Sequence, residues 1–352
     1  MTDWNVSSSS EEFLVDLCQK TLEEEGSIGD DRGIAVVRIS AEIAVKIGRG
    51  VTASEAATQA FAQKELDPSI ACVPKVYRYF RRPRGPAGDE YGYLFMQYIP
   101  GQNLHDLNPE ALPDLVPHVV KIVNALGQIS GSKPGPAGGG TPVGHIYGDH
   151  GAKTAFDSIQ AMNVYMNKRL AYRNAYLAQH RSIHCDDSLD LTAYPLVLCH
   201  GDLCRRNIIL KEDGSLCLLD WGYAGFYPRF FELVALKCTR PYTDGFEGAL
   251  ERDVEAAMEL NVEERRDMQL VTFVRGANLR WSFDESDEDE HDSLIASLER
   301  HAGVRKGSTG DLFACKTEPT ETKPHEQSKE DDKPTSTKGS IGSDRRAHGA
   351  GI

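Results

Sequence analysis

Residues 196–232, LVLCHGDLCRRNIILKEDGSLCLLDWGYAGFYPRFFE, decide the fold of this chain. The stretch begins with an apolar run, passes through His-Gly-Asp at positions 200–202, and reaches Asn207 five residues after that aspartate. A second aspartate, Asp220, follows after two short apolar runs that are separated by Asp-Gly at 213–214. Carboxylate and amide side chains at these intervals predict a site that holds a metal ion beside a proton acceptor.

The two apolar runs are expected to form a β-hairpin. Asp213-Gly214 is a strong signal for a two-residue type I′ turn, and the residues on either side of it favour strands. With these two residues at the centre of the turn, Asn207 faces Asp220, and directly opposed residues have Cβ atoms about 5 Å apart. An amide oxygen and a carboxylate then converge at the open end of the hairpin, as oxygen ligation of one Mg²⁺ ion requires.

Asp202 lies on the loop that leads into the first strand of this hairpin. In phosphoryl transfer the protein mainly positions the reacting groups, while one carboxylate accepts the proton of the attacking hydroxyl. Asp202 is the candidate for that base. Within the same loop, His200 is expected to act by hydrogen bonding, and Gly201 to supply a backbone angle that other residues disfavour. Taken singly, each residue also fits an ordinary surface turn, and it is their joint spacing that favours a site.

The combination HGDLCRRN at 200–207 with Asp-Trp-Gly at 220–222 resembles the catalytic and metal-binding loops of the aminoglycoside phosphotransferase and choline kinase family. The fold of that family is similar to that of protein kinases, which carry His-Arg-Asp, then Asn, then Asp-Phe-Gly. Here Gly replaces the Arg and Trp replaces the Phe, which is the small-molecule-kinase pattern. The resemblance implies an α+β fold, bilobal and protein-kinase-like, with a small antiparallel-sheet N-lobe and a mostly helical C-lobe.

The resemblance implies two lobes joined by a hinge, and the composition changes along the chain indicate the segments that flank them. The expected segments are an N-terminal helical extension at 1–27, the N-lobe with nucleotide-binding strands and hinge at 28–100, the C-lobe with catalytic and metal loops at 101–303, and a disordered tail at 304–352. In the extension, Ser9 and Glu12 have the spacing of a helix capping box. The tail has almost no apolar residues with which to offset the entropy of ordering.

The overall composition is that of a soluble globular protein. The chain has 352 residues, of which 40% are hydrophobic and 26% charged. A net charge of -14 argues against binding to nucleic acid or to anionic membranes, and it suits a cationic small-molecule substrate. The sequence has neither a membrane-spanning apolar run nor the features of a signal peptide, so a cytoplasmic location is expected. No protein partner is evident.

The eight cysteines are scattered along the chain and include no Cys-x-x-Cys pair, which argues against a structural zinc site. Cys72, Cys199 and Cys217 lie inside apolar, strand-like runs. We therefore expect these three to be reduced core residues and not disulfide partners.

Lys46 lies in a short apolar strand, in the phrase Ala-Val-Lys. A lone lysine there could point to solvent from an edge strand, whereas the resemblance implies that it binds nucleotide phosphates. Glu55, in the next helical segment at 52–66, is the candidate to pair with it, although a solvated helix glutamate has the same sequence appearance.

The strand at 93–101 ends in Pro-Gly. By resemblance it is the last strand of the N-lobe and leads into the hinge, where backbone groups of Gln97 and Tyr98 are implied to meet the adenine. Protein kinases place a glycine-rich loop over the phosphates. The corresponding region here offers only Gly26, Gly29 and Gly33.

Beyond the hinge the chain is expected to be largely helical. The predicted helices are 112–130, 155–178, 248–259 and 262–281. The aromatic residues of 225–232 are expected to pack against the large lobe, with Glu232 in a structural hydrogen bond.

Three other segments each have two interpretations. The basic run 81–86 could contact phosphate or form a solvated hairpin tip, and the acidic run 283–292 could recognise an amine or be a solvated loop. The Gly- and Pro-rich connection 131–149 is expected to be flexible. Nearby, Tyr147 and His150 could line a substrate entrance or belong to irregular surface.

Together these observations predict a phosphotransferase that moves the γ-phosphate of ATP, with GTP as the alternative donor, to a hydroxyl of a small molecule with the help of Mg²⁺. The predicted site comprises Asp202 and His200 as catalytic-loop residues, Asn207 and Asp220 as metal ligands, and Lys46, Glu55, Gln97 and Tyr98 as nucleotide-binding residues. The alternatives are a kinase-like binding protein without turnover, and a protein kinase. A protein kinase fits the sequence less well because no Ala-Pro-Glu segment follows Asp220.

Overall fold

The structure of this protein is a computed structural model. It describes residues 4–28, 33–84, 88–108, 110, 112–239, 245–281 and 283. These residues belong to one compact unit that covers 1–304. The predicted tail at 304–352, most of the acidic run 283–292, and Gly29 lie outside the described residues. No helix in the described part of the chain combines the length and the apolar character needed to cross a bilayer.

The N-lobe is built on a four-stranded antiparallel sheet. Its strands are β1 (Ile34–Arg38), β2 (Ile43–Gly48), β3 (Val76–Arg84) and β4 (Asp89–Gln97), in the spatial order β1-β2-β4-β3. Successive side chains of a strand point to opposite faces. In β2 this alternation places Val45 and Ile47 in one apolar cluster, and it leaves Lys46 to the other face.

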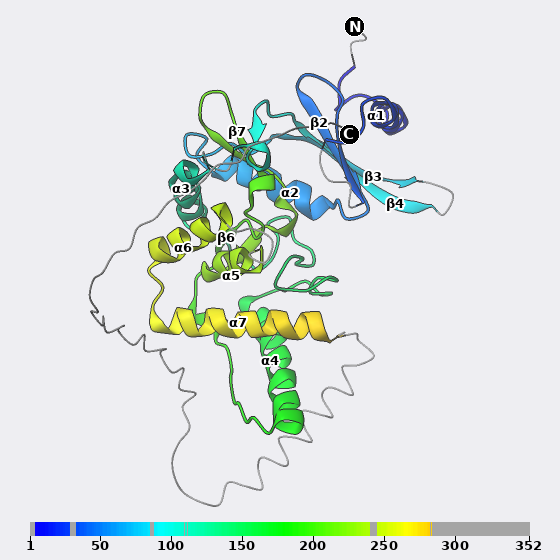
Figure 1. The fold of residues 1–352 in the computed structure, drawn as a ribbon. Coiled ribbons are helices and arrows are strands. Elements are labelled where there is room, and N and C mark those ends of the chain that lie inside the picture. The colour runs from blue at the N-terminus through cyan, green and yellow to red at the C-terminus, as the bar shows by residue number, and fades with distance from the viewer. Residues whose placement is uncertain are drawn as a thin grey trace, which may run out of the picture. The chain divides into compact units, whose positions relative to one another are not determined.

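Two helices cover the two faces of this sheet (Figure 1). Helix α1 (Glu11–Glu25) packs Leu14 and Cys18 against the cluster that contains Val45 and Ile47. Its N-cap is Ser10, one residue later than the capping-box spacing predicts. Helix α2 (Ala53–Glu65) is capped by Thr52 and packs Ala56 beneath Leu94 of β4. The position of α2 brings Glu55 to the face of the sheet toward which Lys46 points.

The basic run 81–86, which was expected either to contact phosphate or to form a solvated hairpin tip, lies mostly in β3. Arg82 forms ion pairs with Glu11 and Glu12 at the start of α1. Arg84 donates a hydrogen bond to Gln19 of the same helix. These arginines therefore tie the sheet to α1, and residues 85–87 lie outside the described part of the chain.

The C-lobe is mainly helical, as expected. Its helices are α3 (Val116–Leu126), α4 (Ile159–Arg181), α5 (Phe230–Thr239), α6 (Phe246–Met258) and α7 (Val262–Arg280), and its short strands are β5 (Gln102–Asn103), β6 (Val197–Cys199), β7 (Ile208–Leu210), β8 (Leu216–Leu218) and β9 (Gly225–Tyr227). Strands β5-β7-β8 form one sheet, and β6 pairs with β9. Figure 1 shows α7 lying across α4 at the end of the lobe away from the N-lobe.

Helix α5 was not predicted. Its sequence, FFELVALKCT, is apolar on nearly every face, so it lacks the amphipathic period that identifies a surface helix. The helix is buried from Phe230 to Leu236, which explains this composition.

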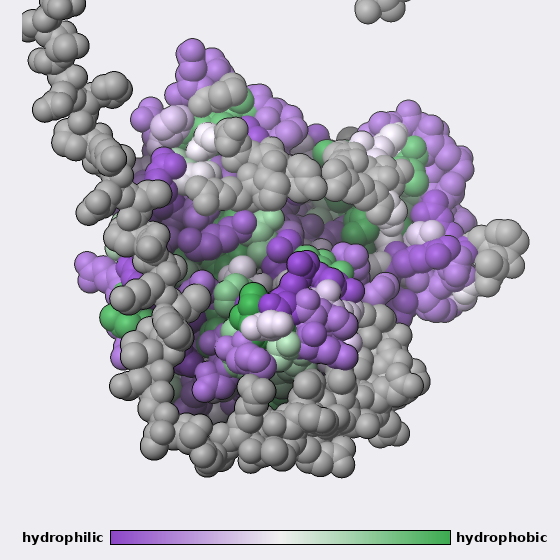
Figure 2. All heavy atoms as spheres, turned by 60° about the horizontal axis from the view of Figure 1, so that its bottom comes forward, coloured by the Kyte–Doolittle hydropathy of each residue, from purple (hydrophilic) through white to green (hydrophobic). Residues whose placement is uncertain are grey.

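On the face turned toward the viewer in Figure 2, hydrophilic residues cover most of the described surface, and hydrophobic residues appear in small separate areas.

The hairpin of β7 and β8 forms, but its register differs by one residue from the prediction. Ile209 pairs with Cys217, and Leu219 donates its backbone N–H to the Asn207 carbonyl, 2.8 Å away. The turn is a three-residue connection in which Gly214 has a φ of +82°. A third turn residue in the left-handed conformation is the common alternative to a two-residue turn. Asn207 therefore does not face Asp220 across the hairpin.

Two of the three cysteines predicted to be reduced are joined by a disulfide. Cys72 lies in the segment after α2, and Cys217 lies in β8, 145 residues away, with the two Cα atoms 4.3 Å apart. Cys72 adds to the edge of β8 through backbone hydrogen bonds with Leu216 and Leu218. The sequence prediction was wrong because this pairing between segments is set only by the tertiary fold. Cys199 is a free, buried cysteine, as expected.

Candidate active site

Lys46 connects the two lobes. Its ammonium nitrogen lies 2.6 Å from Glu55 Oε1 of α2 and 2.9 Å from Asp220 Oδ1 of the C-lobe. The lysine is 7% exposed and Glu55 is 4% exposed. Burial by itself lowers the pKa of Lys46, but the charges of Glu55 and Asp220 outweigh it and raise that pKa above its ordinary value. The lysine therefore points away from solvent, and the predicted Lys46–Glu55 pair is present.

Glu55 and Asp220 have opposite pKa shifts beside the same lysine. Burial raises the pKa of Glu55 above its ordinary value, even though the Lys46 charge opposes this. Burial also acts to raise the pKa of Asp220, but the charge and hydrogen bond of Lys46 prevail and lower it. Asp220 is the more exposed of the two, with 42% of its side chain accessible. An ionised carboxylate at the surface of the site is available to a cation.

Asp220 has a backbone conformation that non-glycine residues seldom adopt. Its φ is 61° and its ψ is 76°, in the left-handed region, where Asp is tolerated better than most residues. The turn directs its carboxylate back to the backbone N–H of Gly222, 3.4 Å away. The following Trp221 is fully buried and donates its indole N–H to the Leu218 carbonyl. The buried tryptophan thus anchors the turn that presents Asp220.

His200 joins the loop of Asp202 to the end of β8. The imidazole is fully buried, its Nε2 lies 2.9 Å from the Leu219 carbonyl, and its Nδ1 accepts the backbone N–H of Asp202 at 3.3 Å. One nitrogen donates and the other accepts, which is the neutral form. Burial is the main cause of a lowered pKa for His200, against the influence of Asp202. The predicted hydrogen-bonding role of His200 agrees with this geometry.

Glu232 holds the same loop from the opposite side. Its carboxylate accepts the backbone N–H of His200 at 2.6 Å and that of Gly201 at 3.2 Å. Glu232 is 2% exposed, and burial raises its pKa to about 7 despite these two hydrogen bonds. The structural hydrogen bond expected of Glu232 is therefore present. Gly201 has a φ of +76°, as predicted for a position that favours glycine.

Asp202 and Asn207 contact each other directly. The Asn207 amide nitrogen lies 2.9 Å from both the backbone carbonyl and the Oδ2 atom of Asp202. With its NH₂ group directed at Asp202, the Asn207 side chain keeps its carbonyl oxygen as an acceptor. The structure thus gathers the predicted residues into two sets, Lys46–Glu55–Asp220 and Asp202–Asn207, and the buried His200 lies between them.

His145 is a site residue that the sequence analysis missed. Its Nε2 lies 3.0 Å from Asp202 Oδ1, and its ring packs edge-on against Tyr223 with centroids 5.3 Å apart. It belongs to the connection 131–149, which was predicted to be flexible. In the structure Gly135 of this connection pairs with Phe226 of β9 through two backbone hydrogen bonds. No sequence signal distinguishes His145 from the nearby His150, because only the fold brings it to Asp202.

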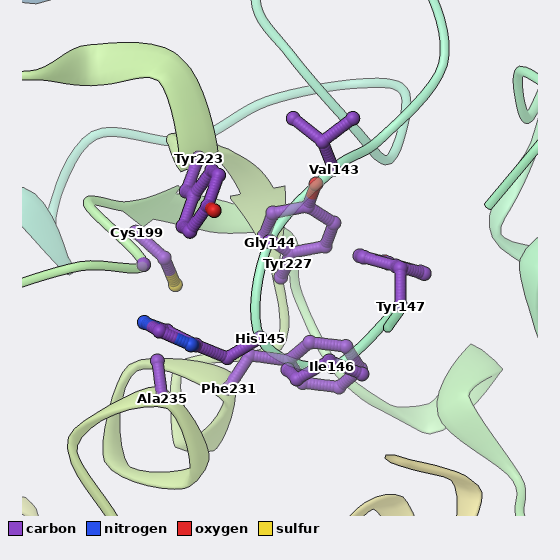
Figure 3. Close-up of a pocket in the computed structure, with 11 residues that line it drawn as sticks. Val143, Gly144, His145, Ile146, Tyr147, Cys199, Tyr223, Tyr227, Phe231 and Ala235 are labelled. Atoms are coloured by element: carbon purple, nitrogen blue, oxygen red, sulfur yellow. The ribbon is translucent and has the colours of Figure 1, made fainter. Parts of the chain in front are cut away.

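A small cavity of about 20 Å³ is lined by His145, Tyr223 and Tyr227, among other residues (Figure 3). This volume holds about one water molecule and is too small for an acceptor molecule. Tyr223 is 38% exposed beside the cavity. Its pKa is raised by burial and by the carboxylates of Asp202 and Asp220, which places both aspartates near one tyrosine.

The predicted hinge residues lie apart from these two sets. The backbone N–H of Gln97 donates to the Lys75 carbonyl, and that of Tyr98 donates to the Glu42 carbonyl, each at 2.8 Å. Both donors are therefore engaged within the protein. An adenine contact from these two residues is left to their carbonyl oxygens, and their nucleotide-binding role stays a prediction.

The residues at the site offer oxygen atoms, which are the ligands that a magnesium ion prefers. Among the described residues, no group of three or more His, Cys, Asp or Glu side chains could hold a metal ion. Mg²⁺ differs from metals that need such clusters, because it is commonly bound through one or two carboxylates together with substrate phosphates and water. The oxygen atoms of Asn207 and the ionised Asp220 are donors of this kind.

Comparison with known proteins identifies the family of the chain. The model of the phosphotransferase enzyme family matches residues 35–270, which include every residue of the two sets. The chain matches no curated protein. Among solved structures, aminoglycoside phosphotransferase APH(4)-Ia is 15% identical with a TM-score of 0.48, and the alignment covers 84% of this chain and 100% of that one.

A GDP complex of wild-type aminoglycoside 2'-phosphotransferase-IIIa is 14% identical with a TM-score of 0.42, over 84% of this chain and 100% of that one. The family match spans well over half of the 352 residues. The chain therefore belongs to the phosphotransferase enzyme family, and its α+β fold combines an antiparallel-sheet N-lobe with a mainly helical C-lobe.

Proposed function

We propose that this phosphotransferase moves the γ-phosphate of ATP to a hydroxyl group of a small molecule with the help of Mg²⁺. The proposal rests on the contacts of Lys46, whose ammonium group lies within 2.9 Å of Glu55 in the N-lobe and of Asp220 in the C-lobe. A buried cation held by two carboxylates beside a proton acceptor is the arrangement that phosphoryl transfer uses to position and neutralise phosphates.

Asp202 is proposed as the base. Its carboxylate lies next to Asn207 and has 17% of its side chain accessible, so an acceptor hydroxyl can reach it. In the reaction the hydroxyl oxygen forms a bond to the γ-phosphorus, the bond from that phosphorus to the bridging oxygen of ADP breaks, and the hydroxyl proton passes to Asp202. One carboxylate in this position serves as the proton acceptor in related chemistry.

Lys46 is proposed to contact the nucleotide phosphates, with Glu55 holding it in place. Asn207 and Asp220 would hold Mg²⁺, which when bound supplies positive charge to the phosphate oxygens. The ionised state of Asp220 favours this role, because Lys46 keeps its pKa below the ordinary value. Use of ATP also agrees with the predicted cytoplasmic location.

A cationic acceptor suits the charge around Tyr223. The carboxylates of Asp202, Asp220 and Asp149 all act to raise the pKa of this exposed tyrosine, after the effect of burial. The Lys46 charge opposes these three carboxylates, which would attract an amine or ammonium group on an acceptor bound beside Tyr223. This inference agrees with the net charge of -14 for the whole chain.

A screen of hydroxyl-bearing small molecules for Mg²⁺-dependent ADP release tests the function. The wild type is compared with Asp202→Asn, which keeps the shape of the side chain, and with Asp213→Asn in the exposed hairpin turn as a matched control. We expect Asp202→Asn to lower kcat by about 10³-fold, within the range for loss of a general base. Equal activity in wild type and Asp202→Asn removes Asp202 from the mechanism.

The competing function is a kinase-like protein that binds nucleotide without turnover. Thermal unfolding with ATP, in the presence and absence of Mg²⁺, separates the two, because a metal site formed with nucleotide adds stability through linkage. A wild type that gains no metal-dependent stability and transfers phosphate to no acceptor favours the binding protein.

A further inference from the structure

The contact between His145 and Asp202 joins segments that are far apart in the sequence. The imidazole Nε2 lies 3.0 Å from Asp202 Oδ1, and 57 residues separate the two. A ring nitrogen at this distance from a carboxylate oxygen donates its hydrogen. The His145 side chain is 28% exposed and that of Asp202 is 17% exposed, so the pair borders solvent.

Both oxygens of the Asp202 carboxylate are held. Oδ1 contacts His145, while Oδ2 accepts a hydrogen bond from the Asn207 amide at 2.9 Å. Rotation of the carboxylate about its bond to Cβ would break both contacts. An ionised carboxylate has about four acceptor positions, and these two partners use two of them. An acceptor hydroxyl can therefore still bind to a carboxylate whose orientation is fixed.

The backbone around His145 is held by hydrogen bonds and by packing. Asn278 of α7 donates its side-chain N–H to the Ile146 carbonyl at 3.0 Å, and Tyr147 donates its backbone N–H to Gly144 at 3.0 Å. Gly144 has a φ of +122°, and a Cβ atom there would lie 3.1 Å from the Tyr223 ring. Ile146 and Tyr147 are buried in the C-lobe core. These contacts hold the backbone that carries the imidazole in place.

We infer that His145 is a positioning residue for phosphoryl transfer: it orients the Asp202 carboxylate toward the acceptor hydroxyl. The inference rests on the proposed function, in which Asp202 is the base. His145 itself exchanges no proton with substrate. It acts by donating a hydrogen bond, and another side-chain donor of similar reach can replace it. Small errors in the orientation of a catalytic group strongly reduce the rate of the chemical step. By fixing the orientation of Asp202, His145 would therefore increase kcat.

Kinetics of three variants test this role. The reaction is Mg²⁺-dependent ADP release, with the best hydroxyl acceptor from the screen and with water. His145→Ala removes the donor, His145→Gln places an amide N–H near the position of Nε2, and His118→Ala changes an exposed histidine of α3 that lies outside the proposed site. We expect His145→Ala to lower kcat about tenfold, with the KM for ATP within about twofold, as is typical when a supporting hydrogen bond is lost. Gln is expected to restore most of kcat, and His118→Ala to leave it unchanged.

Unfolding midpoints of the same variants separate positioning from stability. A positioning role predicts similar midpoints for His145→Ala and His145→Gln alongside different kcat values. An unchanged kcat in His145→Ala, or an equal loss in both variants together with an equal loss of stability, overturns the inference while leaving the proposed function intact.

A measurement without turnover tests the contact itself. In protein labelled with ¹⁵N-histidine, the ring signals of His145 are identified by their loss in His145→Gln. We expect these signals to shift in Asp202→Asn and to stay in place in Asp213→Asn. Unshifted signals in Asp202→Asn overturn the inference. A wild type that releases no ADP with any acceptor overturns both the proposed function and the role that rests on it.

Discussion

Lys46 Nζ lies 2.9 Å from Asp220 Oδ1, although 174 residues separate the two in the sequence. The contact brings a strand of the N-lobe to the turn that follows β8 of the C-lobe. Glu55 completes the arrangement from α2, so three elements meet at one buried ammonium group. Any change in this group affects both the charge of the site and the packing between the lobes.

Lys46→Met is expected to destabilise the protein by about 3 kcal/mol, because it leaves the buried Glu55 carboxylate without its cation. The double variant Lys46→Met/Glu55→Gln is expected to recover part of this loss, since the uncompensated charge is gone. Urea unfolding of the two single variants and the double variant gives the coupling free energy. Additive losses would show that the pair contributes no coupling.

Gly201→Ala is expected to destabilise the protein more than Gly214→Ala does. Both glycines have positive φ, +76° and +82°, so both substitutions carry a backbone cost of about 1 kcal/mol. Only at Gly201 does an added Cβ lie 2.7 Å from a backbone atom, the Tyr223 carbonyl, whereas at Gly214 no atom lies within 4 Å. Urea unfolding and ADP release should both show the difference, and equal losses would contradict the crowding at Gly201.

Glu232 is expected to make stability fall as pH rises. Its pKa is raised from 4.5 to about 7 in the folded protein, so its contribution is fully present below pH 4.5 and is lost as pH rises through 7. A shift of this size corresponds to about 3 kcal/mol. In Glu232→Gln this part of the pH dependence should disappear from urea unfolding measured between pH 4.5 and 8.

Glu264→Gln is the matched control for that experiment. The hydrogen bonds from Arg229 lower the pKa of Glu264, so its contribution is present above the ordinary pKa and is lost as pH falls. Its removal should flatten the acid side of the curve and leave the range from pH 5 to 7 unaffected. If Glu232→Gln keeps the wild-type slope in that range, another group is responsible.

Reduction of the Cys72–Cys217 disulfide is expected to lower the free energy of unfolding. The bond closes a loop of 145 residues, and loops of that order contribute up to about 4 to 5 kcal/mol by the chain-entropy relation. Urea unfolding with and without a thiol reductant measures the loss. The double variant Cys72→Ala/Cys217→Ala should be insensitive to reductant, while Cys185→Ser, at a free cysteine, should behave like the wild type. An equal stability of oxidised and reduced wild type would contradict the prediction.

Much of the local structure is determined by the sequence itself. Short apolar runs form β1 and β2, Thr52 caps α2, and Asp213-Gly214 lies in the turn between β7 and β8. These features depend on neighbours a few residues apart, so single-sequence patterns capture them. The spacing of Asp202, Asn207 and Asp220 likewise predicted a site, but Asn207 does not face Asp220 across the hairpin as that spacing had suggested.

Contacts between distant segments were decided by the tertiary structure alone. The hairpin register depends on whether the turn uses two residues or three, and a shift of one residue changes which side chains face each other. The Cys72–Cys217 bond and the approach of His145 to Asp202 join residues 145 and 57 positions apart. No local pattern encodes such pairings, since they follow from how helices and sheets pack. The chain itself thus specified the elements and the chemistry of the loops, while packing decided which side chains meet.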